Sequence, residues 1–331
     1  MLRMADNGVE SLSLDSLSPT VCLPTEPLPK LRRFRGMTKK KLLERIQLGH
    51  GLGDGSKYLP WLTLRKKNSS PNSNQVCSWM PPLRRSAHYF SRGEYHTALV
   101  LLWLGVQDLR EQFPIWPIPH PHPLETSNST HANRPWARGL LTISKEANIK
   151  HGSEFGTRLP YIASLDLLAT VQLRTHRMLA VFSSKPISEP TMEVKWRTLE
   201  RLELERRYTA EIDGRYFVSS SALVPQLTAG QLEWWLDAST LACAPELLAY
   251  AERFAIQLND RLDLSIRENV ARAAHTLSIP LESAWFLFRH CAWTQAIDID
   301  PSIRVLTSYP VRAGGRAMRD ALRRRLFGET W

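Results

Sequence analysis

The sequence has few cysteines, no long apolar run and fewer acidic than basic residues. Its four cysteines, Cys22, Cys77, Cys243 and Cys291, are scattered without a Cys-x-x-Cys pair, so neither a zinc ribbon nor a disulfide framework is indicated. No stretch approaches the roughly 18–20 apolar residues that a membrane-spanning helix needs. Residues 1–16 carry acids and serines where a signal peptide needs an apolar segment. These absences predict a soluble, cytoplasmic protein with no membrane partner.

The charge balance favours an anionic partner. Lys and Arg number 43 against 32 for Asp and Glu, which gives a formal net charge of +11 over 331 residues. Such an excess suits nucleic acid, an acidic protein or a membrane surface. The hydrophobic content of 43% is ordinary for a globular chain, and the length favours two domains over one.

Hydrophobic periodicity predicts an α/β core in the first two thirds of the chain. Residues 1–36 end in a cationic patch and are interpreted as a flexible basic arm, which either contacts DNA or is a plain disordered terminus. The stretches 68–87 and 117–146 are predicted to be loops because Pro, Asn, Ser and His are dense there. The predicted helices are 38–48, 94–104 and 189–211, and the predicted strands are 106–116, 162–171, 178–184 and 216–219.

The last third of the chain has a different, mainly helical pattern. Helices are predicted at 228–241, 244–258, 264–277, 280–290 and 315–327, with two short strands at 293–299 and 303–308. Helices followed by a short hairpin predict a winged-helix-like module. The expected organisation is therefore an arm at 1–36, an α/β domain at 37–222 and a C-terminal domain at 223–331.

Three polar residues stand where a hydrolase of phosphodiesters needs them. Glu94 opens an apolar helix, Asp166 interrupts an apolar strand, and Lys185 closes the next strand. Carboxylates can hold Mg²⁺ against a phosphate oxygen, and a cation can orient the attacking water. If the two strands are antiparallel neighbours, Asp166 and Lys185 meet at one end of the sheet. By spacing alone, a solvent-facing Asp166 and an ordinary strand-end Lys185 remain an alternative.

Several blocks of the sequence, in the same order, resemble the TnsA family, the endonuclease subunit of heteromeric cut-and-paste transposases. The blocks are a Gly-rich run before Tyr-Leu-Pro-Trp-Leu at 49–63, Ser-Arg-Gly-Glu at 91–94, DLREQFP at 108–114, Ile-Lys-His at 149–151 and LERLELERRY at 199–208. They extend over about residues 40–220. The resemblance implies a restriction-endonuclease-like core, a mixed sheet flanked by helices, before a helical, winged-helix-like C-terminal domain.

The resemblance also implies which residues carry the reaction. The metal-binding Glu of the family falls on Glu94, its Asp on Asp166 and its Lys on Lys185. Mg²⁺, with Mn²⁺ as a substitute, is then expected on Glu94, Asp166 and the backbone carbonyl of Ser184. One position departs from the pattern: Ser183 stands where an acidic residue or Gln is common. Because serine is uncharged and short, this predicts weaker metal binding or a supporting water.

The implied activity is cleavage at the 5′ ends of a transposon during cut-and-paste transposition. The implied partners are transposon-end DNA, a TnsB-like subunit with an integrase fold and a TnsC-like AAA+ ATPase, in the nucleoid-associated cytoplasm of a bacterium. Two alternatives stay open. The chain is either a catalytically weakened DNA-binding and assembly subunit of the same complex or, more remotely, a standalone restriction-like nuclease.

Other polar residues have both a functional and a structural interpretation. Glu111 and Gln112, in the matched strand block, are either supporting residues of the site or, for Glu111, half of a salt bridge with Arg110 or Lys150. His151 either touches substrate or lies on the surface.

A group of histidines and a group of arginines also have a functional and a structural interpretation. The histidines at 120, 122 and 131 are interpreted as part of a solvated loop and not as a metal site, because the prolines keep them extended. Arginines on the last helix are candidates for contact with DNA or a partner, with a solvated helix as the alternative; they are Arg316, Arg319, Arg323 and Arg324.

Overall fold

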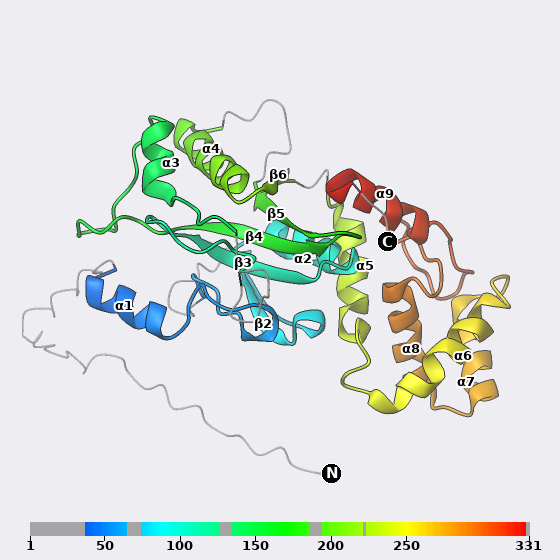
Figure 1. The fold of residues 1–331 in the computed structure, drawn as a ribbon. Coiled ribbons are helices and arrows are strands. Elements are labelled where there is room, and N and C mark those ends of the chain that lie inside the picture. The colour runs from blue at the N-terminus through cyan, green and yellow to red at the C-terminus, as the bar shows by residue number, and fades with distance from the viewer. Residues whose placement is uncertain (1–36, 65–73, 126–133, 186–193, 221–222, 329–331) are drawn as a thin grey trace, which may run out of the picture. The chain divides into compact units, whose positions relative to one another are not determined.

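A four-stranded mixed sheet forms the centre of the α/β region (Figure 1). The computed structural model describes residues 37–64, 74–125, 134–185, 194–220 and 223–328. The strands lie in the order β3-β4-β5-β6, with β3–β4 and β4–β5 antiparallel and β5–β6 parallel. Their bounds are Asp108–Ile115, Ala163–Gln172, Arg177–Ser184 and Gly214–Ser219. The predicted strands and their antiparallel pairing are confirmed; the arm at 1–36 and His131 lie outside the described residues.

Helices cover both faces of this sheet, which explains the nearly continuous apolar runs of β4 and β5 (Figure 1). Helix α2 (Arg92–Trp103) is buried over most of its length on one face, in a cluster that includes Leu167 and Phe182; we call this cluster the α2-side core. Helices α3 (Leu140–Glu146) and α4 (Trp196–Glu211) cover the other face. There Leu165, Val181 and Tyr208 form the α4-side core.

A hairpin precedes α2 where the sequence predicted a loop. Strands β1 (Val76–Met80) and β2 (Arg85–Tyr89) pair antiparallel, joined by a 3-10 turn at Pro81–Leu83. The expectation of a loop at 68–87 was therefore wrong for its second half. Every second side chain of β2 is buried. This alternation is not visible as a hydrophobic pattern in the sequence, because the strand contains polar residues and follows the prolines of the turn. Helix α1 (Lys39–Gln47) begins after its N-cap Thr38, whose side chain accepts from Lys41 N.

The C-terminal region is helical, as predicted, but it lacks the two predicted strands. Helices α5 (Gln226–Trp235), α6 (Leu248–Asn259), α7 (Ile266–Leu277), α8 (Leu281–Thr294) and α9 (Gly315–Phe327) lie near their predicted positions.

The two strands expected at 293–299 and 303–308 do not form. Helix α8 continues through Trp293, which is buried, and the following loop anchors Ile297 and Ile299 in the core. The alternation of apolar residues at 293–299 therefore comes from loop side chains that are buried in the core. The β-hairpin of the predicted winged-helix-like module is not present in this described segment.

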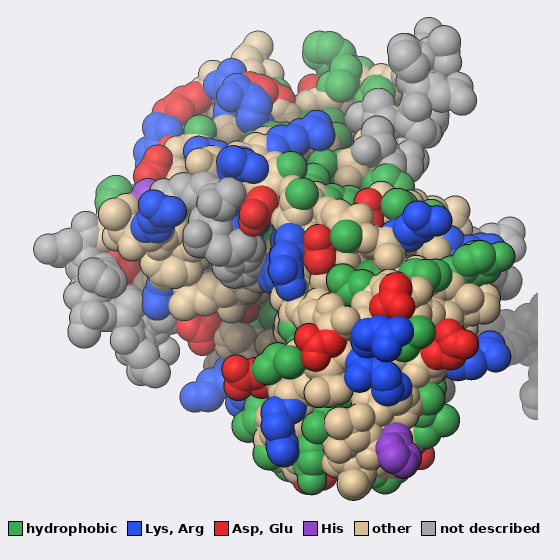
Figure 2. Space-filling model, turned by 90° about the vertical axis from the view of Figure 1, so that its right-hand side faces the viewer, with side chains coloured by type: hydrophobic (Ala, Val, Ile, Leu, Met, Phe, Trp, Pro, Cys, Tyr) green, Lys and Arg blue, Asp and Glu red, His purple; other side chains and the backbone are tan. Residues whose placement is uncertain are grey.

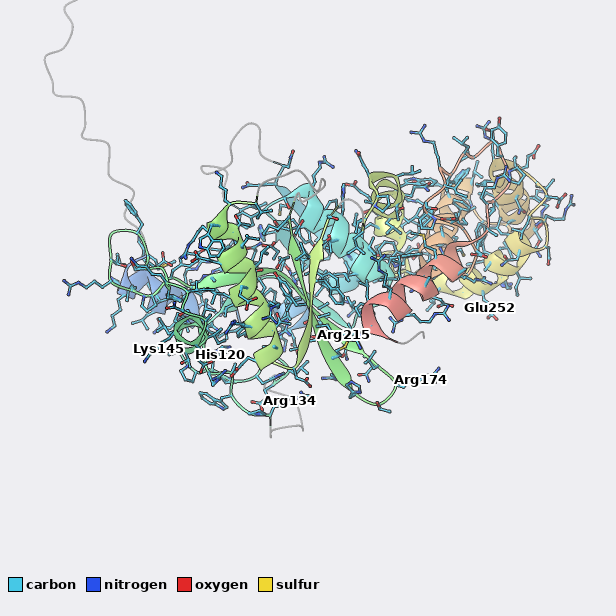
Figure 3. All side chains as sticks on the ribbon, turned by 90° about the horizontal axis from the view of Figure 1, so that it is seen from above. His120, Arg134, Lys145, Arg174, Arg215 and Glu252 are labelled. Carbon is cyan, nitrogen blue, oxygen red and sulfur yellow. The ribbon has the colours of Figure 1, made fainter. Side chains whose placement is uncertain are left out.

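The segment 117–146 is more buried than its composition predicted. His120 donates or accepts through Nε2 at 3.0 Å from the Tyr208 hydroxyl, and His122 Nε2 lies 3.0 Å from the Ile212 carbonyl. Both side chains are buried, so the expectation of a solvated histidine loop was wrong for them. They attach the segment to α4 and its C-terminal end; Figure 3 labels His120 beside that helix.

This burial predicts a pH dependence of stability. Burial lowers the pKa of His120 and of His122, since the charged imidazolium loses its water. In the unfolded chain the pKa is about 6.5, so below that pH the unfolded state binds protons first and the free energy of unfolding falls. We expect the melting temperature of the parent to drop more steeply between pH 7 and pH 5 than that of His122→Asn. Equal slopes would contradict the prediction.

Contacts join the C-terminal helices to the sheet. Arg215 of β6 donates to the Leu326 carbonyl of α9 at 3.2 Å (Figure 3), and the α2-side core continues into α5 and α8. The predicted boundary between domains at 222 and 223 stays a prediction. Among the described residues, no helix combines the length and apolar character needed to span a bilayer.

Candidate active site

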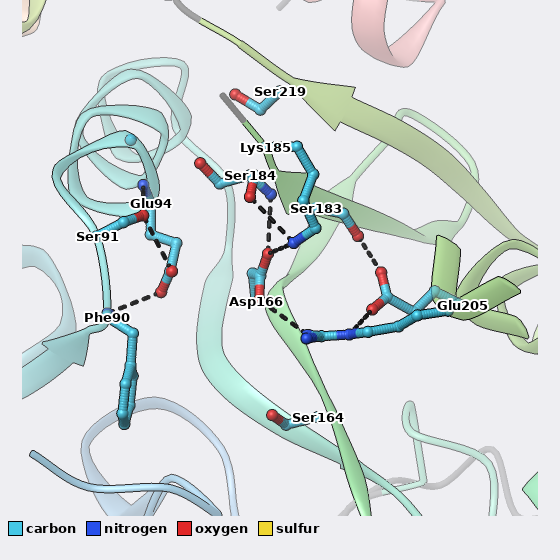
Figure 4. Close-up of polar contacts among 12 residues, drawn as sticks. Phe90, Ser91, Glu94, Ser164, Asp166, Ser183, Ser184, Lys185, Glu205 and Ser219 are labelled. Atoms are coloured by element: carbon cyan, nitrogen blue, oxygen red, sulfur yellow. Dashed lines mark hydrogen bonds and ion pairs between the residues drawn. The ribbon is translucent and has the colours of Figure 1, made fainter. Parts of the chain in front are cut away.

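Glu94 is held at the first turn of α2 by a capping arrangement. Ser91 is the N-cap: its hydroxyl accepts from Glu94 N at 3.2 Å and donates to Glu94 Oε1 at 3.0 Å. The Phe90 amide donates to Glu94 Oε2 at 2.9 Å (Figure 4). A carboxylate at a helix N-terminus is stabilised by the helix dipole. The sequence therefore fixes both the start of the helix and the direction of this buried side chain.

Asp166 lies where strands β4 and β5 separate. Their pairing begins at Leu167–Phe182 and runs away from Asp166. In place of a backbone partner, the Ser184 amide donates to Asp166 Oδ2 at 2.9 Å. The aspartate thus interrupts an apolar strand at the point where the sheet opens, which offsets the cost of burying its charge.

Lys185 completes the group. Its Nζ lies 3.1 Å from Asp166 Oδ2 and 3.1 Å from the Ser184 carbonyl oxygen. The Lys185 amide donates to the Ser219 carbonyl of β6 at 3.1 Å, which extends the strand pairing up to the site. The ammonium therefore contacts the two oxygen donors, Asp166 and Ser184, that the family resemblance assigns to a metal ion.

The structure brings the three predicted residues together where the inner strands β4 and β5 separate (Figure 4). Burial raises the pKa of Glu94 to about 7, and the negative charge of Asp166 is the next cause, partly offset by Lys185. Asp166 is only 6% exposed and Glu94 only 5%. Two buried carboxylates that repel one another suit a divalent cation between them.

The donor set is compatible with Mg²⁺ but small. Among the described residues, no group of three or more His, Cys, Asp and Glu side chains is arranged for a metal. Magnesium commonly uses one or two carboxylates and takes the rest of its shell from water, carbonyls and phosphate oxygens. Glu94, Asp166 and the Ser184 carbonyl meet that requirement with oxygen atoms alone.

A further carboxylate, that of Glu205, lies next to Ser183 and was not predicted from the sequence. The Ser183 hydroxyl donates to Glu205 Oε2, and Tyr216 donates to the same oxygen at 3.2 Å. Arg201 donates to Glu205 Oε1 at 2.8 Å, and its other nitrogen lies 3.6 Å from Asp166 Oδ1. Burial is the main reason that the pKa of Glu205 is raised.

The uncharged Ser183 is therefore backed by an acidic residue from α4. The signal was present in the matched block at 199–208, where Arg201 and Glu205 stand four apart on one helix face.

The neighbouring Glu111 has a structural role. Its carboxylate forms two bonds of 2.7 Å with Arg85, and the His88 amide donates to it at 3.3 Å. The salt-bridge interpretation thus fits, although the partner is Arg85 and neither of the expected residues. Gln112, the next residue, does reach the site, because its side-chain nitrogen donates to Glu94 Oε2 at 3.2 Å.

The arginines of α9 are mostly committed to the fold. Arg323 is 3% exposed and donates to the Leu104 carbonyl at 2.6 Å, so the expected contact with DNA or a partner was wrong for this residue. Arg319 donates to the Thr294 carbonyl and Arg316 to the Gln295 carbonyl. Arg324 is exposed. On the face shown in Figure 2, basic and acidic side chains are interspersed and do not form a single cationic patch.

A cavity of about 170 Å³ adjoins the group on the α4 side of the sheet. Its lining includes Lys150, His151, Arg197, Arg201 and Glu205. Arg201 connects it with Asp166 through the 3.6 Å ion pair. His151 is half-buried here, and its Nδ1 lies 2.7 Å from the Gly152 carbonyl oxygen.

The structure is a mixed α/β fold whose sheet is flanked by helices, with a helix-borne Glu and an Asp–Lys pair where the two inner strands separate, and this arrangement is consistent with a TnsA-like nuclease fold. No family model matches the sequence. The chain is 29% identical over 227 residues to the Transposon Tn7 transposition protein TnsA of Escherichia coli, which covers 68% of this chain and 73% of that protein. This similarity supports the resemblance to the TnsA family that the sequence blocks indicate.

Proposed function

We propose that this protein is the DNA endonuclease subunit of a heteromeric transposase and cuts the 5′ ends of a transposon. The observation that carries the proposal is the convergence of Glu94, Asp166 and Lys185 where the inner strands β4 and β5 separate. The similarity to a Tn7 transposition protein supports a role in transposition. The oxygen donors of the site support Mg²⁺ as the metal ion, with Mn²⁺ as a substitute. Expected partners are transposon-end DNA, an integrase-fold subunit and an AAA+ ATPase.

The residues present divide the work of hydrolysis. Glu94, Asp166 and the Ser184 carbonyl would hold the divalent ion, which when bound supplies positive charge to a phosphate oxygen and acidity to a water. The Lys185 ammonium, 3.1 Å from Asp166, is placed to hold the attacking water and to offset charge on the phosphate. Arg201 keeps Asp166 and Glu205 in place from the opposite side.

The overall charge fits this substrate. A net charge of +11 provides attraction to the DNA backbone without reading of bases. The cationic residues that line the cavity on the α4 side, Lys150, Arg197 and Arg201, place positive charge next to the carboxylates. Recognition of a particular end sequence then belongs to the integrase-fold partner.

The experiment is cleavage of labelled transposon-end duplex by the full chain with its partner subunits. We expect a break at the 5′ end of the element that requires Mg²⁺ or Mn²⁺ and disappears with EDTA. Cleavage that persists in EDTA would contradict the metal-dependent mechanism.

The two alternatives have distinct outcomes in the same assay. Assembly on the ends without any 5′ cut identifies the catalytically weakened subunit, for which the uncharged Ser183 is the supporting observation. Metal-dependent cutting of unrelated duplex by the chain alone identifies a standalone nuclease.

A further inference from the structure

Strand β3 contains a backbone conformation that its own sequence does not favour. Gln112 has φ of 49°, in the left-handed region, although it lies inside a strand. Among the described residues, the other five non-glycine residues with positive φ lie at turns or helix ends; they are Arg84, Asn148, Asp213, Ser278 and Gln295. A non-glycine residue held in this region is strained and persists only where its surroundings impose it.

The strained residue faces the site. The register of β3 with β4 is continuous on both sides, and the pair left out is Gln112 with Asp166. Side chains two apart on a regular strand share a face. Yet Leu167 packs in the α2-side core and Leu165 in the α4-side core. In β3, Leu109 likewise packs in the α2-side core and Phe113 in the α4-side core, so both strands change faces at this point, and Asp166 lies at the change.

The left-handed turn directs the Gln112 carboxamide toward the Glu94 carboxylate. Its nitrogen donates to Glu94 Oε2 at 3.2 Å, and its oxygen accepts from the Ser164 hydroxyl of β4 at 2.9 Å. The side chain is 3% exposed, so these bonds are not exchanged with bulk water. One amide thus connects the helix that carries Glu94 with the strand that carries Asp166.

We propose that the left-handed turn at Gln112 is retained to position Glu94, so that Gln112 acts as a positioning residue for the metal-binding carboxylate. The inference rests on the proposed function, because the direction of the Glu94 carboxylate affects metal affinity only if Glu94 holds the ion. Partners that orient a metal ligand typically change metal affinity 10- to 100-fold when they are removed. A residue kept only for the backbone would be replaced by glycine without loss.

Glycine separates the two roles, because it adopts positive φ without strain while lacking the carboxamide. We expect the full chain with Gln112→Gly to melt, metal-free, within about 3 °C of the parent. Its affinity for Mn²⁺, measured by calorimetry without DNA, is expected to fall about 10- to 100-fold. Ser164→Ala, which frees the other end of the amide, is expected to give a smaller loss in the same direction.

The matched control is Asn148→Gly, which removes an exposed residue of similar φ, 53°, after α3. It should leave Mn²⁺ affinity unchanged. Mn²⁺ affinity within about twofold of the parent in Gln112→Gly would overturn the inference. A large drop in melting temperature that accompanies the metal loss would also overturn it, in favour of a structural role. A parent chain that binds no Mn²⁺ would overturn the proposed function, and this inference with it.

Discussion

Replacing Asp166 by asparagine is expected to lower the rate of DNA cleavage by about 10³-fold or more while the protein stays folded. The substitution keeps the shape and an oxygen acceptor for the Ser184 amide, now 2.9 Å away, but removes the charge that faces Glu94 and Lys185. A metal's stabilisation of transition-state charge is worth several kcal/mol, and each ~1.4 kcal/mol is tenfold in rate. The measurement is single-turnover cleavage in the assembled complex.

A matched control is Asp213→Asn, at an exposed aspartate beyond the end of α4. It should cleave like the parent. Assembly of the complex on transposon ends, followed by gel shift, should be retained in both variants. Parental cleavage by Asp166→Asn would show that the metal-binding residues have been assigned wrongly.

The second large effect concerns stability. Glu111→Ala is expected to lower the free energy of unfolding by about 3–5 kcal/mol, since it leaves the Arg85 guanidinium buried without its carboxylate. Glu111 is fully buried, and Arg85 is 7% exposed. Arg85 also donates to the Leu109 carbonyl at 2.8 Å and to the Gly55 carbonyl at 3.0 Å. Urea unfolding followed by circular dichroism measures the change.

The double variant Arg85→Met with Glu111→Leu tests the cause. Removing both charges eliminates the uncompensated guanidinium, so part of the loss should be recovered. Recovery is expected to be incomplete because the carbonyls of Gly55 and Leu109 lose their donor. The exposed pair Arg261–Asp263 provides the control, where Asp263→Asn should leave stability unchanged. A loss in Glu111→Ala no larger than this control would contradict the prediction.

The Gly-rich block at 49–63 contacts strand β3. Tyr58 donates through its hydroxyl to the Glu111 carbonyl at 2.9 Å, and Trp61 N donates to the Gln112 carbonyl at 3.1 Å. The glycines at 51 and 53 have positive φ, which turns the chain so that these aromatic residues reach β3. The block holds the strand segment that carries Gln112.

The local sequence pattern was sufficient to predict structure where the contacts of a residue lie within a few positions along the chain. Thr38 and Ser91 start helices because a short hydroxyl side chain satisfies free amides of the first turn. The nearly continuous apolar run of β5 indicates a strand buried on both faces, as the structure shows, whereas the position of Asp166 within β4 left a solvent-facing side chain open as an alternative. Pattern failed at 293–299, where the alternation of anchored loop residues resembles a strand, and at β2, where polar residues hide the alternation.

The sequence by itself indicated the candidate site residues Glu94, Asp166 and Lys185, through the blocks that resemble the TnsA family and through their positions at the end or the interruption of an apolar element. Only the tertiary structure decided what surrounds them. The Glu205 carboxylate behind Ser183, the Arg85 partner of Glu111 and the left-handed turn at Gln112 depend on contacts between residues far apart along the chain. The physical reason is range: caps and periodicity act within a few residues, whereas the charge pairing and strain of buried groups are set by whichever elements pack against them.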